Sequence, residues 1–123
     1  MQIFLLGIFG VLGTLSRYGL QGWAQGQSSA TFPAGTLAVN LLGCLLIGGL
    51  NRLALEHLWF PPEWRIAMTI GFLGAFTTFS TFSYETFRML EDGEWARASL
   101  YVSVSLIGGL IGVAAGIKLA ELI

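Results

Sequence analysis

The chain has 123 residues, of which 54% are hydrophobic and only 11% are charged, and its mean hydropathy is +0.73. An ordinary soluble domain has about 25% charged residues, so this composition excludes a soluble globular domain. The net charge of −1 says nothing about nucleic acid, but the sequence has no basic cluster, so we expect no nucleic acid partner.

Four segments are long and apolar enough to cross a lipid bilayer. Charged residues are absent from 18–51, 66–84 and 98–117, and also from the segment before Arg17. A helix needs about 20 apolar residues to span the hydrocarbon core, and these stretches are too long and continuous for barrel strands. We therefore predict an all-α integral membrane protein, whose four transmembrane helices are expected at roughly 2–23, 33–55, 64–88 and 96–120.

The predicted spans leave no room for a soluble domain. The first span has no basic segment before it and is longer than the apolar part of a signal peptide, so we interpret it as a membrane helix. We expect a single transmembrane domain over 1–123, in a multi-pass protein of the plasma membrane. In a Gram-negative cell this would be the inner membrane.

Small residues in the spans predict close contacts between helices. In the fourth span, Gly108, Gly112 and Gly116 repeat every four residues and share one helix face. This spacing lets membrane helices approach one another closely. Four helices can hardly surround a water-filled path and also pack together, so we expect a homo-oligomer, most simply a homodimer.

Basic residues are divided evenly between the two sides of the predicted membrane. The side with the chain ends carries Arg52, Arg65 and Lys118, and the other side carries Arg17, Arg88 and Arg97. The positive-inside rule orients a protein only where the two sides differ. The even division favours insertion in both orientations and an antiparallel dual-topology homodimer. The alternative is that features other than charge select one orientation.

The third span contains an unusual polar stretch, GFLGAFTTFSTFSYE, at residues 71–85. Gly71 and Gly74 precede the adjacent β-branched residues Thr77 and Thr78, and this combination is a poor helix interior. We therefore predict that the third helix is broken near 74–78. At membrane depth, the carbonyls freed by a break are tolerated only inside protein or beside a cavity. Free carbonyls are also ligands for a hard cation.

The polar side chains of the spans suit a small dehydrated anion. The hydroxyls of 77–83 and the Asn40 amide can donate hydrogen bonds, and phenylalanine ring edges carry partial positive charge. Tyr101 and Ser105 share a face of the fourth span. Such a lining has no full positive charge that would trap an ion. The alternative is structural: an interhelical hydrogen bond for Asn40, aromatic packing for the phenylalanines and interfacial anchoring for Tyr101.

Two charged residues near these segments have two interpretations each. Arg17, in LSRYG, either extends to the membrane interface or makes a vestibule electropositive. Glu85 is the only acid near the polar stretch. It is either a solvated helix end or a gate at the mouth of a pore.

The motifs GTLAVN (35–40) and GFLGAFTTFSTFSYE (71–85), in a chain of four short spans, resemble those of the Fluc (CrcB-type) fluoride ion channels. The motif LSRYG adds modest support, and the resemblance covers nearly the whole chain. It implies a passive, fluoride-selective channel that exports fluoride from the cytoplasm and lowers its toxicity. It also implies an antiparallel homodimer with two pores and a structural sodium ion at the interface.

The resemblance further implies roles for individual residues. The fluoride pore would be lined by Phe79, Phe82, Asn40, Ser80, Thr81, Tyr101 and Ser105, with Thr78 in the same run. Backbone carbonyls of Gly74 and Thr77 would hold the sodium ion, and Arg17 and Glu85 would belong to a vestibule or gate.

This sequence departs from the family pattern at two positions. Phe76 stands where a small residue is usual, so we assign it no pore role. Gly109 stands one turn beyond Ser105, where another hydroxyl is expected, and backbone or water would have to substitute for it.

Two other functions were weighed against a fluoride channel. A small proton-coupled multidrug transporter also has four spans, but it needs an acid within the first membrane helix, and no acid precedes Glu56. A non-transporting assembly subunit would explain the glycines and aromatics but not the hydroxyl cluster. We expect no enzyme, because the sequence shows no nucleophile–base pair or metal-binding cluster.

Overall fold

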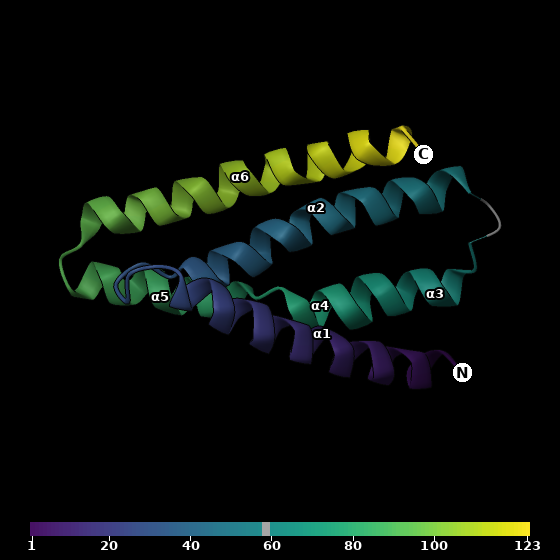
Figure 1. Ribbon diagram of the computed structural model, residues 1–123, viewed down its shortest axis with the longest axis horizontal. Helices are drawn as coiled ribbons and strands as arrows, with labels where there is room; N and C mark the ends of the chain where they lie inside the picture. The colour runs from purple at the N-terminus through teal and green to yellow at the C-terminus, as the bar shows by residue number, and fades with distance from the viewer. Residues whose placement is uncertain (58–59) are drawn as a thin grey trace.

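Every regular element in the computed structural model, which describes residues 1–57 and 60–123, is a helix (Figure 1). The first, second and fourth spans are α1 (Gln2–Gly26), α2 (Ala34–Glu56) and α6 (Trp95–Glu121). The third span consists of α3 (Pro62–Ile66), the π-helix η1 (Ala67–Leu73), α4 (Gly74–Phe76) and α5 (Phe79–Glu91). All four spans are long and apolar enough to cross a membrane, which confirms the predicted fold class.

The four spans run alternately in opposite directions, so both chain ends lie at the same end of the bundle (Figure 1). The connections 27–33 and 92–94 lie at the opposite end. Gly93 turns the chain between α5 and α6 with a φ of 74°, a conformation that costs glycine little because it has no Cβ.

Glycines bring α2 and α6 into direct backbone contact. A Cβ at Gly48 would overlap the Val113 carbonyl, and a Cβ at Gly116 would overlap the Leu45 carbonyl. Gly112 lies beside Cys44 in the same interface. The predicted packing role of the fourth-span glycines is therefore confirmed, and α2 and α6 lie side by side over most of their length (Figure 1).

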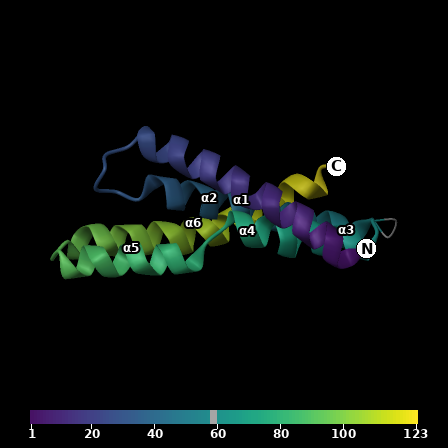
Figure 2. The same ribbon diagram turned by 90° about the horizontal axis from the view of Figure 1, so that it is seen from below.

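The two halves of the third span pack on different helices. Its first half, from α3 to α4, lies along α1, whereas α5 lies along α6 (Figure 2). The change of partner occurs at Thr77 and Thr78, which have extended backbone between α4 and α5. The predicted break near 74–78 is therefore confirmed.

The π-helix before the break was not predicted from the sequence. In η1 the Gly74 N–H reaches the Thr69 carbonyl, five residues earlier, so the helix is wider than an α-helix. Phe72 and Phe76 then stack with ring centroids 5.6 Å apart. Phe76 is buried with Val39 and Leu73 and therefore packs in the core. This position agrees with the decision to assign Phe76 no pore role.

Candidate functional site

The break in the third span is held by one side chain of α2. Thr78 N–H donates to Asn40 Oδ1 over 2.8 Å, and Asn40 Nδ2 donates to the Thr78 carbonyl over 3.0 Å. The amide therefore supplies the partner that the Thr78 N–H loses at the break, and it adds a second donor to the Thr78 carbonyl, which as the N-cap of α5 already accepts the first bond of that helix. The structural alternative for Asn40, an interhelical hydrogen bond, is thus present, and one Nδ2 hydrogen has no partner among the described residues.

Two carbonyls at the break lose the donors that an unbroken helix would give them. In such a helix, Gly74 would accept from Thr78 N–H, and Thr77 would accept from Thr81 N–H. Thr78 N–H instead donates to Asn40, and Thr81 N–H donates to Thr78 Oγ1 over 3.2 Å. The oxygens of Gly74 and Thr77 are therefore left for another partner, and carbonyl oxygens are the ligands that hard cations prefer.

The surface of α2 is shaped to receive the break. Gly43 lies one turn after Asn40, and a Cβ there would overlap the methyl carbon of Thr77. The pair Asn40 and Gly43 thus provides polar partners for one residue of the break and space for the other. Sequence reasoning found Asn40 but missed Gly43, because nothing in the sequence tells which residue faces it.

A cluster of hydroxyls surrounds the first turn of α5. Thr78 Oγ1 caps this helix, donates to Thr81 Oγ1 over 2.9 Å, and lies 3.5 Å from Ser80 Oγ. The N-terminus of a helix carries partial positive charge and unpaired N–H groups, and both favour an anion. The structure therefore brings together three of the hydroxyls predicted as anion donors, whereas Thr77 Oγ1 donates to the Leu73 carbonyl and Ser83 is exposed outside the cluster.

A cavity of about 350 Å³ lies beside the break, between α2, the third span and α6. We call it the break cavity; its lining is Asn40, Gly43, Cys44, Ile47, Thr69, Leu73, Gly74, Thr77, Thr78, Phe79, Phe82, Ser105 and Leu106. Phe79 is 78% exposed, and its ring centroid lies 5.9 Å from that of Phe82. Ser105 Oγ is inaccessible to solvent and has no partner among the described residues.

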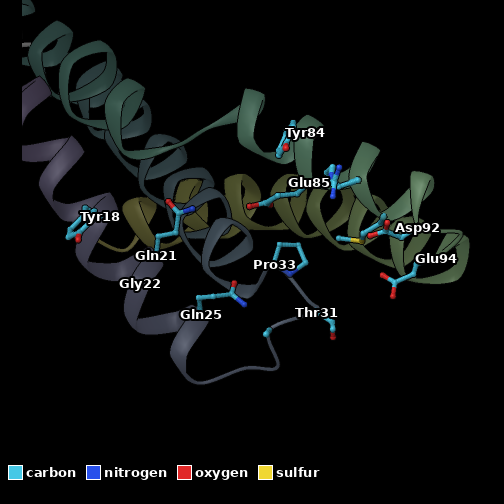
Figure 3. A pocket seen from close by; sticks show the side chains of 13 residues that line it. Tyr18, Gln21, Gly22, Gln25, Thr31, Pro33, Tyr84, Glu85, Asp92 and Glu94 are labelled. Atoms are coloured by element: carbon cyan, nitrogen blue, oxygen red, sulfur yellow. The ribbon is translucent and has the colours of Figure 1, made fainter.

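A second cavity, of about 860 Å³, lies where α5 diverges from α1 (Figure 3). We call it the outer cavity; its lining is Tyr18, Gln21, Gly22, Gln25, Ala30, Thr31, Pro33, Tyr84, Glu85, Arg88, Met89, Asp92 and Glu94. Both cavities result from the break. The outer cavity lies where α5 does not pack on α1, and the break cavity lies where α4 does not pack on α6.

Hydrogen bonds connect one residue from each of the four spans beside the outer cavity. Gln21 Nε2 donates to Thr36 Oγ1 over 3.2 Å, and Thr36 Oγ1 donates to Glu85 Oε1 over 2.7 Å. Tyr101, which is completely buried, donates its hydroxyl to Glu85 Oε2 over 2.7 Å. Glu85 is therefore a hydrogen-bonded residue within α5, not a solvated helix end. Sequence reasoning missed Gln21 and Thr36, whose partners are distant in the chain.

Tyr101 contacts one residue from each cavity lining but belongs to neither lining. Its ring lies 5.1 Å from that of Phe82, in the lining of the break cavity, while its hydroxyl faces Glu85 in the lining of the outer cavity. The single hydroxyl proton is directed at the carboxylate. Tyr101 therefore packs behind Phe82 without lining the break cavity, and in this conformation it offers no O–H donor there.

Several residues singled out from the sequence line neither cavity, among them Ser80, Thr81 and Tyr101, and also Arg17 and Gly109. Arg17 is half-buried on α1, one turn before Gln21, and makes no ion pair within the described ranges 1–57 and 60–123. Gly109 is buried against Cys44, where a Cβ would lie 3.3 Å from Sγ. Gly109 is thus part of the contact between α2 and α6.

No side-chain cluster in the part of the chain that the structure describes resembles a metal centre. Groups of three or more His, Cys, Asp or Glu residues that could hold an ion are absent from it. Backbone oxygens at the break are a separate kind of candidate cation ligand, independent of such clusters.

Comparison with known proteins gives matches over nearly the whole chain. The family described as "CrcB-like protein, Camphor Resistance (CrcB)" matches residues 4–117. A protein of Geotalea daltonii named fluoride-specific ion channel FluC is 48% identical over 121 residues, which cover 98% of each chain. Proteins of the same name from Geobacter sulfurreducens and Stutzerimonas stutzeri are each 49% identical over 119 residues, which cover 97% of this chain and 96% of theirs.

Replacing Asn40 by leucine should destabilise the fold, because the Thr78 N–H loses its partner and the Thr78 carbonyl loses one of its two donors. Each unsatisfied buried group costs about 1–3 kcal/mol, so we expect the free energy of unfolding to fall by about 2 kcal/mol or more. Chemical denaturation in detergent would measure this change, and hydrogen exchange at the Thr78 amide should become faster. Asn51→Leu, at an exposed position of the same helix, is the control. Equal stability losses in the two variants would contradict the role of Asn40.

Proposed function

The chain belongs to the CrcB-like family, and we propose that it is a fluoride-specific ion channel. Relatives that are 48–49% identical over nearly the full chain carry that name. It is a multi-pass protein of the plasma membrane, with four membrane-spanning helices. Its activity is transport and not catalysis.

The benefit of such a channel follows from the chemistry of fluoride. Hydrogen fluoride is a weak acid that crosses membranes in its neutral form and ionises in a more alkaline cytoplasm. A passive path lets the inside-negative potential expel the anion, at about 2.3 kcal/mol per charge for each 100 mV. Export by this route lowers fluoride toxicity without an energy-consuming step.

We assign the fluoride path to the break cavity and the residues around it. The main support is the buried hydroxyl of Ser105, which has no partner in the described chain and lies in the same lining as Phe79 and Phe82. Ring edges and hydroxyls attract an anion without the full charge that would hold it. The pore residues are Phe79, Phe82, Asn40, Ser80, Thr81, Tyr101 and Ser105.

The other side chains of the path act in different ways. Ser80 and Thr81, with the N-terminus of α5, offer donors. Asn40 fixes the break and keeps one N–H for the anion, and Tyr101 supports the ring of Phe82. Glu85 lines the outer cavity, which serves as the vestibule, and Arg17 contributes positive potential from outside its lining.

A structural sodium ion fits the carbonyls of Gly74 and Thr77. Both oxygens lack their helical donors, because Asn40 and Thr78 side chains accept the N–H groups that would otherwise reach them. Two oxygens are fewer than a hard cation needs, so the same pair from a second copy would complete the site. The ion would hold the two breaks together and is not itself transported.

A second copy in the opposite orientation would complete the channel. Phe79 and Gly74 are exposed beside the break cavity, which a partner would cover. The even division of basic residues allows both orientations in one membrane. The antiparallel homodimer would have two fluoride pores, with the whole of 1–123 forming one transmembrane domain in each copy.

Reconstituted protein should release fluoride from liposomes far faster than empty liposomes do. Phe79→Ile or Phe82→Ile should lower this efflux about tenfold or more, since losing about 1.4 kcal/mol at the barrier slows a step tenfold. Efflux measured with a fluoride electrode, with the dimer checked by size exclusion, tests both statements. Phe87→Ile is the matched control, because Phe87 is 59% exposed on α5 and outside both cavities.

The outcomes of this experiment separate two claims. Efflux no faster than from empty liposomes would overturn the channel function itself. Full efflux in both the Phe79 and Phe82 variants would overturn only the pore assignment.

Sodium should stabilise the folded protein more than other monovalent cations do. At a concentration 100 times its dissociation constant, a bound ion adds about 2.7 kcal/mol to the free energy of unfolding. Thermal unfolding in sodium, potassium and N-methylglucamine chlorides at equal ionic strength measures the effect. Equal melting temperatures in the three salts would rule out a specific sodium site.

Reporter fusions at the C-terminus should give signals from both sides of the membrane. Replacing Ser28 and Ser29, in the connection before α2, by lysine should impose a single orientation, because the two sides of the membrane then differ in basic charge. A reporter active on one side only, with the unsubstituted sequence, would reject dual topology.

A further inference from the structure

The carboxylate of Glu85 lies at the end of a directed series of hydrogen bonds that begins at Gln21. Gln21 on α1 donates to Thr36 on α2, and Thr36 donates to Glu85 in the third span. Tyr101 on α6 donates to the other carboxylate oxygen. In Figure 3, Gln21 and Glu85 point toward one another across the space between α1 and α5.

The directions of these bonds follow from the number of protons. Each hydroxyl has one proton, and those of Thr36 and Tyr101 are both directed at Glu85. The Gln21 amide occupies a lone pair of Thr36 Oγ1. This contact favours the rotation of the hydroxyl in which its proton points away from Gln21 and at the carboxylate.

Loss of the hydrogen bond from Gln21 to Thr36 would favour a different conformation of the Glu85 side chain. Thr36 and Tyr101 are its only donors among the described residues, and Glu85 already lines the outer cavity. If the Thr36 hydroxyl turns away, one carboxylate oxygen loses its partner and is better solvated in the cavity. A negative charge there would repel an anion on its way to the break.

We propose that Gln21 is a positioning residue for permeation: by orienting the Thr36 hydroxyl, it keeps the Glu85 carboxylate bonded to α2 and α6 at the wall of the vestibule, so that the carboxylate does not extend into its interior. The inference rests on the proposed function. Gln21 acts through Thr36, so its effect disappears wherever the Thr36 hydroxyl is absent.

Gln25 provides a matched comparison one turn further along α1. Its amide donates to the carbonyls of Ser29 (3.2 Å) and Phe32 (2.9 Å), and its Oε1 accepts from Gly35 N–H (3.1 Å). Gln25 thus attaches the same helix to the start of α2, but it makes no hydrogen bond to Thr36 or Glu85 within the described chain. A purely structural role for glutamines on this face would affect both positions alike.

The test is a double-mutant cycle on fluoride efflux from liposomes, using Gln21→Met and Thr36→Val. Methionine keeps the length of glutamine and valine keeps the shape of threonine, while both remove the polar group. We expect Gln21→Met to slow efflux about fivefold when Thr36 is intact, the factor expected for one neutral hydrogen bond. In the Thr36→Val background it should cause no further loss.

Two further backgrounds define the mechanism. In the Glu85→Gln background, which lacks the charge, Gln21→Met should not change fluoride efflux. In the Thr36→Ser background, which retains the hydroxyl, it should still slow efflux about fivefold. Gln25→Met should change efflux by the same factor with and without Thr36→Val. Gln21→Leu is a second variant in case the methionine protein does not elute as a folded dimer.

Each outcome supports or overturns the proposal. An equal loss from Gln21→Met in the presence and absence of the Thr36 hydroxyl, or no loss in either, would overturn it. So would a Gln25→Met effect that disappears together with the Thr36 hydroxyl in the same way. Absence of efflux from the unsubstituted protein would overturn the channel function instead, and the inference with it.

Discussion

A backbone N–H or carbonyl inside a membrane needs a hydrogen-bond partner within the protein. In this chain the requirement is most severe at the break, Thr77 and Thr78, where the helix is interrupted. The Asn40 amide meets it by bonding both the N–H and the carbonyl of Thr78. Because the third span can then stop and restart, its first half packs on α1 and its second half on α6. Both cavities result from this change of partner, and so do the two carbonyls left without helical donors.

Much of this fold is predictable because it depends on short-range patterns. Gaps between charged residues predicted the four spans, and glycines followed by adjacent threonines predicted the break. The hydroxyls of Thr78, Ser80 and Thr81 lie together because they are neighbours in the sequence at the start of α5. The observed glycine contacts between α2 and α6 likewise follow from a spacing of four residues.

The rest of the site depends on contacts between distant residues. Thr36 and Glu85 are 49 positions apart, and Gln21 and Thr36 are 15 apart, so no local pattern marks them as partners. The π-helix η1 has no evident sequence signal, although it determines how the chain enters the break. The three phenylalanines at three-residue spacing look equivalent in the sequence. The break separates them, burying Phe76 while Phe79 remains exposed.

The division of the third span has a consequence for how substitutions in α1 act. A substitution that faces α3, η1 and α4 alters the packing of the first half, whereas α5 does not pack on α1. Among the described residues, α1 reaches the second half through the hydrogen bonds from Gln21 by way of Thr36 to Glu85. One transmembrane segment thus responds to the same helix in two ways, by packing before the interruption at Thr77 and Thr78 and by hydrogen bonding after it.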